Sequence, residues 1–177
     1  LASISTATDG VLFLPVSTLL QKIAPAEFIH QRSLQLSVGD RIAMGGLRES
    51  LSRYGYRAVG QVEEHGEFSV RGSILDLFPM GSSIPFRIDF FDDEVESIRS
   101  FDSDTQKSIE KIDGIRLLPA QEYPLDDEGI KRFRLNFRET FAIDPNTCPV
   151  YVDISEGISS PGVEYYLPLF FEHLSSL

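Results

Sequence analysis

Residues 86–99 read FRIDFFDDEVESIR, and this stretch decides the fold. Apolar and charged side chains alternate through its first half, the period-two pattern of a strand with one buried face. Asp92 and Asp93 then predict a two-residue hairpin, after which a second strand returns over residues 95–101. The side chains that we expect to be buried are Phe86, Ile88 and Phe90.

Residues 66–79 continue the same pattern on the N-terminal side. Phe68 and Val70 face one way and Ser69 and Arg71 the other, which indicates a half-buried strand. Gly72 permits a bulge or a tight bend, and a further strand follows until it is stopped by a proline at position 79. Parallel strands normally need a long crossover, so we predict an antiparallel meander over residues 56–101.

The flanking sequence predicts strands and helices around this meander. We expect a strand over residues 33–38, and a helix from about Gly46 to Gly55 with an apolar stripe of Leu47, Leu51 and Tyr54. A further strand over residues 115–118 leads to a helix from about residue 126 to 141. The rest of the C-terminal part predicts irregular structure around one short helix.

The N-terminal residues 1–32 resemble the tail of an α/β unit. The apolar run at residues 11–14 predicts a buried strand, and a helix is expected from Pro15 to about Ile23. The fold class predicted for the whole chain is therefore α/β, in the α+β sense of an antiparallel sheet with flanking helices.

Composition limits the possible functions. The 177 residues suit one ordinary domain, or one small domain with pieces of another. A formal net charge of -11 opposes bulk, non-specific binding to DNA. The single cysteine, Cys148, excludes an internal disulfide and indicates a reducing, cytoplasmic setting. No apolar run approaches the roughly 20 residues of a membrane span, and no export signal is seen.

Catalytic chemistry is not indicated by any motif. The sequence has no phosphate-binding glycine loop with its lysine and no serine nucleophile elbow, and its three histidines suit surface or structural roles. The acidic residues 92–96 allow two interpretations, a site for a hard cation or a solvated hairpin tip, and the second is favoured. We therefore expect no catalytic residue, no metal and no cofactor in this chain.

Two longer motifs carry a family resemblance. RGSILDLFP at 71–79 and FRIDFFDDEVESIR at 86–99 closely resemble the UvrA-interaction module that UvrB shares with the transcription-repair coupling factors. EEHGEF at 63–68 and LLPAQEYP at 117–124 resemble the coupling factors more than UvrB, as does GVEYYLPLFF at 162–171. The equivalent region of UvrB, part of an ATP-dependent DNA helicase, is the alternative.

The resemblance implies a domain organisation. Residues 1–32 would end a UvrB-like domain 1a, residues 33–115 would form the inserted UvrA-interaction domain, and residues 116–177 would begin domain 1b. ATP and Mg²⁺ would belong to the full-length protein, as would contacts with RNA polymerase and DNA. UvrA is the partner expected for this chain itself.

The resemblance also implies which residues contact UvrA. Arg57 and Arg71 align with arginines used for this contact, whereas Ser69 stands where UvrB has a further arginine. Ser73 and Phe78 complete the candidate set; Phe78 can be either a core residue or an exposed aromatic anchor, and the core position is favoured. Arg87, by contrast, is expected to pair across the sheet with an acidic neighbour.

Overall fold

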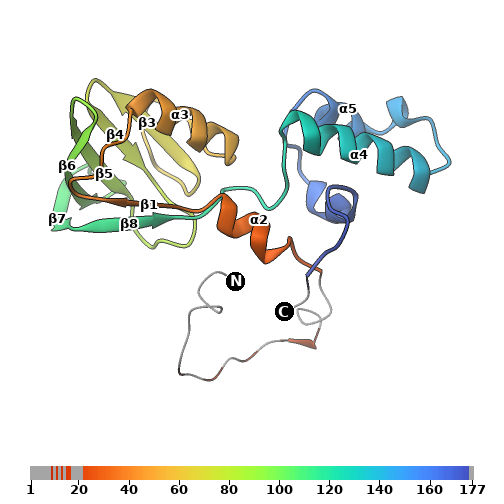
Figure 1. Ribbon diagram of the computed structural model, residues 1–177, viewed down its shortest axis with the longest axis horizontal. Coiled ribbons are helices and arrows are strands. Elements are labelled where there is room, and N and C mark those ends of the chain that lie inside the picture. Colours follow the sequence, from red (N-terminus) through yellow and green to blue (C-terminus); the bar gives the residue numbers. More distant parts are fainter. Residues whose placement is uncertain (1–8, 10, 12, 14, 17–21, 176–177) are drawn as a thin grey trace. The chain divides into compact units, whose positions relative to one another are not determined.

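The computed structural model describes residues 9, 11, 13, 15–16 and 22–175 (Figure 1). The chain divides into two compact units, one formed by Leu1–Gln31 with Glu122–Leu177 and the other by Arg32–Gln121. The predicted α+β class is confirmed. How these units correspond to the named domains of the family stays a prediction.

A six-stranded sheet forms the centre of the Arg32–Gln121 unit, with strand order β2-β3-β4-β5-β6-β7. The strands are β2 (Arg57–Ala58), β3 (Glu67–Arg71), β4 (Ile74–Leu77), β5 (Phe86–Phe91), β6 (Glu94–Phe101) and β7 (Ser108–Ile112). Tight two-residue turns join β3 to β4 and β5 to β6; the second is the predicted hairpin, and the first is the tight bend that Gly72 was expected to allow. Both turns use a left-handed residue, Gly72 with φ 62° and Asp92 with φ 53°.

The meander is antiparallel from β3 to β7, but its first pair is parallel, so that part of the prediction is wrong. Arg57 lies opposite Glu67 and Ala58 opposite Phe68 in a parallel register. A pair of only two residues needs no crossover helix, because the loop at residues 59–66 is enough to bring the chain back. Strand β7 was not predicted either; its residues are mostly exposed and show no apolar alternation.

One face of the sheet packs against the helix α3 (Met44–Arg53) and is called the inner face (Figure 1). Leu47 and Leu51 of α3 are buried there, as predicted, and Gly55 ends the helix region with φ 88°. The core also contains side chains from the antiparallel pair β1 (Leu34–Ser37) and β8 (Gly114–Leu117). Its sheet residues include Phe68, Leu75, Leu77, Ile88, Phe90, Val95 and Ile98.

The other unit contains α2 (Ala26–Gln31), α4 (Asp127–Thr140), η1 (Pro145–Thr147), α5 (Pro149–Ser155) and η2 (Val163–Leu169). The predicted helix after residue 126 is confirmed, and the Asp126 side chain caps it by accepting from the Gly129 N–H. Phe133, Phe137, Tyr151 and Phe170 form an aromatic core between α4, α5 and η2. The region after α4 is therefore more regular than predicted.

The N-terminal strand prediction is wrong for the residues that can be tested. Val11 and Phe13 are in no strand and are 82% and 89% exposed. The predicted helix after Pro15 falls mostly on residues 17–21, which lie outside the described residues. Ile23 forms an antiparallel bridge with Ser175 instead of ending a helix.

Within the described part of the chain, no helix has the length and apolar character needed to cross a membrane.

Replacing Leu51 with alanine should destabilise the sheet unit by about 2–5 kcal/mol, because its side chain is fully buried and its loss leaves a cavity. Native-state hydrogen exchange of the β5 and β6 amides measures this loss. Leu135→Ala, at a position 58% exposed on α4, is the control and should change exchange by no more than about 0.5 kcal/mol. Equal effects of the two changes would contradict the assigned core.

Candidate protein-docking surface

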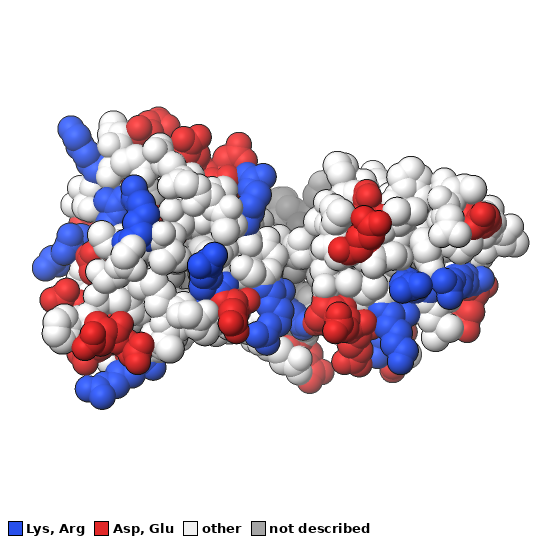
Figure 2. All heavy atoms as spheres, turned by 90° about the horizontal axis from the view of Figure 1, so that it is seen from above, with Lys and Arg blue, Asp and Glu red and all other residues white. Residues whose placement is uncertain are grey.

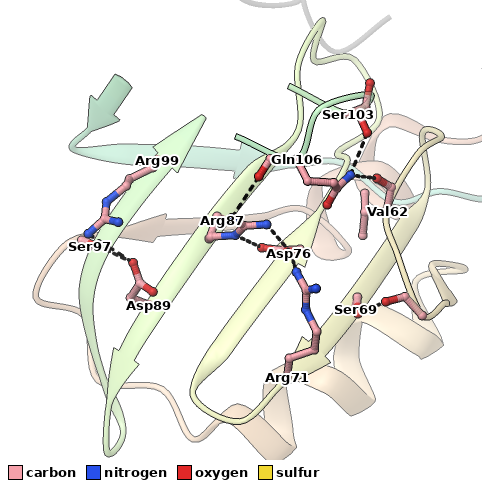
Figure 3. Close-up of polar contacts among 11 residues, drawn as sticks. Val62, Ser69, Arg71, Asp76, Arg87, Asp89, Ser97, Arg99, Ser103 and Gln106 are labelled. Atoms are coloured by element: carbon pink, nitrogen blue, oxygen red, sulfur yellow. Dashed lines mark hydrogen bonds and ion pairs between the residues drawn. The ribbon is translucent and has the colours of Figure 1, made fainter. Parts of the chain in front are cut away.

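The face of the sheet opposite α3, the outer face, carries a row of polar side chains (Figure 3). In register from β3 to β7 the row contains Ser69, Asp76, Arg87, Arg99 and Lys111. Neighbours directly across a sheet are close enough to interact, and like charges there oppose each other. The adjacent arginines at 87 and 99 therefore need carboxylates, which Asp76 and Asp89 supply.

Asp76 is the central member of this row and is only 1% exposed. Arg87 holds its carboxylate in a two-point contact, with Nε 2.7 Å from Oδ1 and Nη2 2.8 Å from Oδ2. Arg71 Nη2 also donates to Oδ2. The cluster of one carboxylate and two guanidinium groups has a formal charge of +1, so Asp76 is neutralised and positive charge is left over.

The two arginines differ in exposure because loops cover only one of them. The Arg87 side chain is 17% exposed, and its guanidinium lies over the Phe101 ring and donates to the Gln106 carbonyl oxygen. Gln106 joins the covering loops, since its Nε2 donates to the carbonyl oxygens of Val62 and Ser103. The hydrogen bond with Asp76 raises the pKa of Arg87, with burial opposing it, so this arginine remains charged under the loops.

Arg71 lies at the open end of β3 and its side chain is 53% exposed (Figure 3). The hydrogen bond to Asp76, the one that Arg71 forms among the described residues, fixes the direction of the guanidinium and uses one of its five N–H donors. The remaining donors face solvent and suit a carboxylate of another protein. A partner would therefore meet an arginine that is already oriented.

Arg57, on β2, is held by a carboxylate in a similar way, beside the other end of β3. Its Nη2 donates to Glu67, a residue only 6% exposed, and lies 3.6 Å from Glu64. Glu67 also accepts from the backbone N–H groups of Glu63 and Glu64, both at 2.9 Å. Burial by itself raises the pKa of Glu67, but these donors and Arg57 outweigh it, so the pKa is lowered.

These contacts place the two exposed arginines near opposite ends of β3, with Arg71 on β3 itself and Arg57 on the neighbouring strand β2, opposite Glu67. Glu67 and Arg71 are four residues apart, which corresponds to about 13 Å along β3. Each guanidinium is bound to a buried carboxylate whose other hydrogen bonds are internal. The site can bind two acidic groups without first ordering its own side chains.

The other predicted contact residues lie differently. Ser73 is exposed in the turn between β3 and β4. Ser69 is 3% exposed and donates to the Gly60 carbonyl oxygen, while Phe78 is 7% exposed and packs with Val62 and Phe101. Because the loop at 59–66 covers both side chains, neither Ser69 nor Phe78 is an exposed anchor in this structure. The predicted cross-sheet pairing of Arg87 is confirmed.

The two carboxylates that hold the arginines, Asp76 and Glu67, were not predicted from the sequence. Asp76 lies between leucines in the strand sequence ILDL, and this position could have indicated a buried, paired carboxylate. A charged residue inside an apolar strand must be paired, and the outer-face register predicts Arg87 as its partner. Glu67 gave no such signal, because it is preceded by other acidic residues in a loop.

The acidic hairpin at residues 92–96 holds no cluster suited to a metal. Nowhere among the described residues do three or more His, Cys, Asp or Glu side chains converge as a metal site would require. Glu94 instead lies 3.6 Å from Arg41, in a pair that is largely exposed.

Comparison with known proteins identifies the sheet unit. The sequence profile of the UvrB interaction domain matches residues 34–123, which contain the whole six-stranded sheet and the two exposed arginines, Arg57 and Arg71. The chain therefore belongs to the UvrB interaction domain family.

Curated relatives confirm the resemblance to transcription-repair coupling factors. The chain is 49% identical to the Haemophilus influenzae transcription-repair-coupling factor over 98% of its own length, and 46% identical to that of Escherichia coli over 97%. The Bacillus subtilis factor is 31% identical over 98% of the chain. The chain spans only about 15% of the length of the first two relatives and 16% of the third.

Asp76→Asn should destabilise the sheet unit by about 3 kcal/mol, because it leaves the covered Arg87 without a carboxylate. Arg71→Ala, at the exposed end of the same cluster, should cost less than about 1 kcal/mol. Urea unfolding of both variants tests this order, with Glu96→Gln on the exposed side of β6 as a control. A larger loss of unfolding free energy in Arg71→Ala than in Asp76→Asn would contradict the role of Asp76 in holding Arg87.

Glu67→Gln should reveal a pH-dependent contribution to stability. The folded pKa of Glu67 is lowered, so its charged form stabilises the fold above the unfolded pKa of about 4.3, and this is lost as pH falls through the folded value. The difference in unfolding free energy between wild type and variant should be constant from about pH 5.5 to 7 and shrink towards pH 3. A difference that stays unchanged over the whole range would contradict the role of Glu67.

Proposed function

We propose that this chain is the docking module through which a transcription-repair coupling factor recruits UvrA. The observation that carries the proposal is the pair of exposed arginines, each bound to a buried carboxylate, within a domain of the UvrB interaction family. No reaction takes place on this surface. Its chemistry is recognition of acidic groups on another protein.

The geometry supports a protein partner with carboxylates at a matching spacing. Arginine is suited to such contacts because its planar donors meet a carboxylate at two points. The guanidinium groups of Arg57 and Arg71 are oriented before binding, so less side-chain entropy is lost when the partner arrives. The net charge of -11 opposes a polyanion such as DNA over the whole chain.

The similarity to transcription-repair-coupling factors supports a role in repair. In the full-length protein this module would bring UvrA to a stalled RNA polymerase, so that nucleotide excision repair begins at the lesion. DNA translocation with ATP and Mg²⁺, and the contact with RNA polymerase, would belong to parts of the protein outside this chain. By the family resemblance, another part of the full-length protein would cover the docking surface, so that UvrA binding would be regulated by competition.

Arg71→Ala should weaken binding to purified UvrA by about 1–3 kcal/mol, which is about 5- to 150-fold in Kd. Arg57→Ala should also weaken it, because both arginines offer free donors to the partner. Isothermal titration calorimetry with the 177-residue chain measures the change, and circular dichroism checks that each variant is folded.

The matched control is Arg48→Ala, which removes an exposed arginine from α3 on the opposite side of the sheet. It should bind UvrA like the wild type. The assignment of this surface would be contradicted if the Arg71 variant bound UvrA with wild-type affinity. An equal loss of affinity in the Arg48 variant would contradict it as well. Failure of the wild-type chain to bind UvrA would sink the proposed function itself.

A further inference from the structure

The basic residues of the C-terminal segment are concentrated on one helix. Residues 122–175 contain ten Asp and Glu residues but only four Lys and Arg residues. All four basic residues lie between positions 131 and 138, within two turns of α4. In Figure 2 the blue atoms of the right-hand unit correspondingly form one group. An acidic segment with its cations confined to one short helix has a distinct basic patch.

The basic residues follow the helical period on the solvent side of α4. Phe133 and Phe137 are buried on one side of the helix, at 0% and 1% exposure. The exposed side carries a continuous stripe at spacing i, i+3, i+4 and i+7. This stripe, called the α4 stripe, consists of Lys131, Arg134, Leu135 and Arg138.

The cations of the α4 stripe are not neutralised by carboxylates of the residues that the structure describes. Arg132, beside the stripe, pairs with Glu172 at 3.2 Å and with Glu128 at 3.9 Å. Lys131, Arg134 and Arg138 form no ion pair with any residue that the structure describes. Arg138 is nevertheless oriented, because its guanidinium lies 5.8 Å from the centre of the Tyr151 ring on α5.

An exposed apolar side chain lies among these cations. Leu135 is 58% exposed, and Ile143, a little beyond the end of α4, is 54% exposed. An isolated exposed leucine needs no explanation, but a leucine flanked by unpaired arginines has the composition of a protein interface. Phosphate groups are bound by charged and polar side chains, so a phosphate site does not explain an apolar leucine at this central position.

We propose that the α4 stripe is a second docking surface, which binds an acidic amphipathic segment of a protein. The partner would place an apolar side chain on Leu135 and carboxylates on Arg134 and Arg138. A short segment makes these contacts within about 10 Å, the range in which charges act before salt screens them. Duplex DNA would instead bring its phosphates close to the acidic remainder of the same segment.

This proposal does not depend on the UvrA-docking proposal. The α4 stripe belongs to the unit that contains Glu122–Leu177, whereas Arg57 and Arg71 belong to Arg32–Gln121. Substitutions in the α4 stripe are therefore expected to leave the affinity for UvrA unchanged.

Fluorescence anisotropy with the 177-residue chain tests the proposal. The probe is a labelled synthetic helical peptide with leucines flanked by glutamates, and its partner probe has glutamine at every glutamate. At about 50 mM salt the glutamate peptide should bind about tenfold more tightly than the glutamine peptide. Arg134→Glu with Arg138→Glu should remove this preference, and Leu135→Ala should weaken binding of both peptides.

The control is Arg48→Glu with Arg53→Glu, which makes the same change in charge on exposed positions of α3. It should keep the preference for the glutamate peptide. An equal loss in this control would overturn the proposal in favour of general charge attraction. Tighter binding of a DNA duplex than of the glutamate peptide, abolished by the α4 substitutions, would overturn it in favour of a nucleic-acid site.

A second copy of the chain is the remaining occupant to exclude. Sedimentation velocity at about 50 mM salt should show a monomer, whose mass is unchanged in the Arg134→Glu, Arg138→Glu variant. A dimer that the α4 substitutions dissociate would assign the stripe to self-association and overturn the proposal. Circular dichroism confirms folding, and Arg138→Gln provides a milder variant if the double substitution unfolds the chain.

Discussion

The carboxylate of Asp76 is buried in the six-stranded sheet, and it must be neutralised where it lies. Burying an unpaired carboxylate costs several kcal/mol, so the sheet can form only with Arg87 opposite it on β5. This requirement also fixes the strand register, because a slip of one residue would move Asp76 to the inner face among the buried leucines. One ion pair thus selects the pairing of β4 with β5 and, through the surplus charge, orients Arg71 at the surface.

Loops cover one part of the outer face and leave the rest exposed to solvent. This difference in exposure separates the arginine that stabilises the fold from the arginine that is available to a partner. The loops at 59–66 and 102–107 meet through Gln106 and cover Val62, Phe78 and Phe101, a small second core on this face. Arg87 lies beneath them and stabilises the fold, whereas Arg71 lies beyond their edge. The same carboxylate therefore serves an internal and an external arginine, so substitutions that look equivalent in sequence should separate into effects on folding and on binding.

Much of the fold could be predicted from local patterns, and the failures share a physical cause. The hairpins and α3 follow from strict alternation and from glycine at turns, which depend on neighbouring residues alone. The parallel pairing of β2, the strand β7 and the burial of Ser69 depend on loops that return from elsewhere in the chain, whereas the core position favoured for Phe78 is confirmed. Side-chain alternation places Ser69 and Phe78 on the outer face correctly, but it does not reveal that a loop covers part of this face.

The two arginine surfaces differ in how their cations are held, and this difference bears on selectivity. Arg57 and Arg71 are oriented by Glu67 and Asp76, so they favour carboxylates at one spacing and lose little entropy on binding. Arg134 on α4 pairs with no carboxylate among the described residues, and arginine and lysine side chains of this kind keep most of their rotamer freedom until a partner arrives. Such a surface tolerates partners of varied spacing at lower affinity. A fixed pair of arginines therefore suits one defined protein, whereas the α4 stripe, in which Arg134 can adjust beside an exposed leucine, suits a flexible acidic segment.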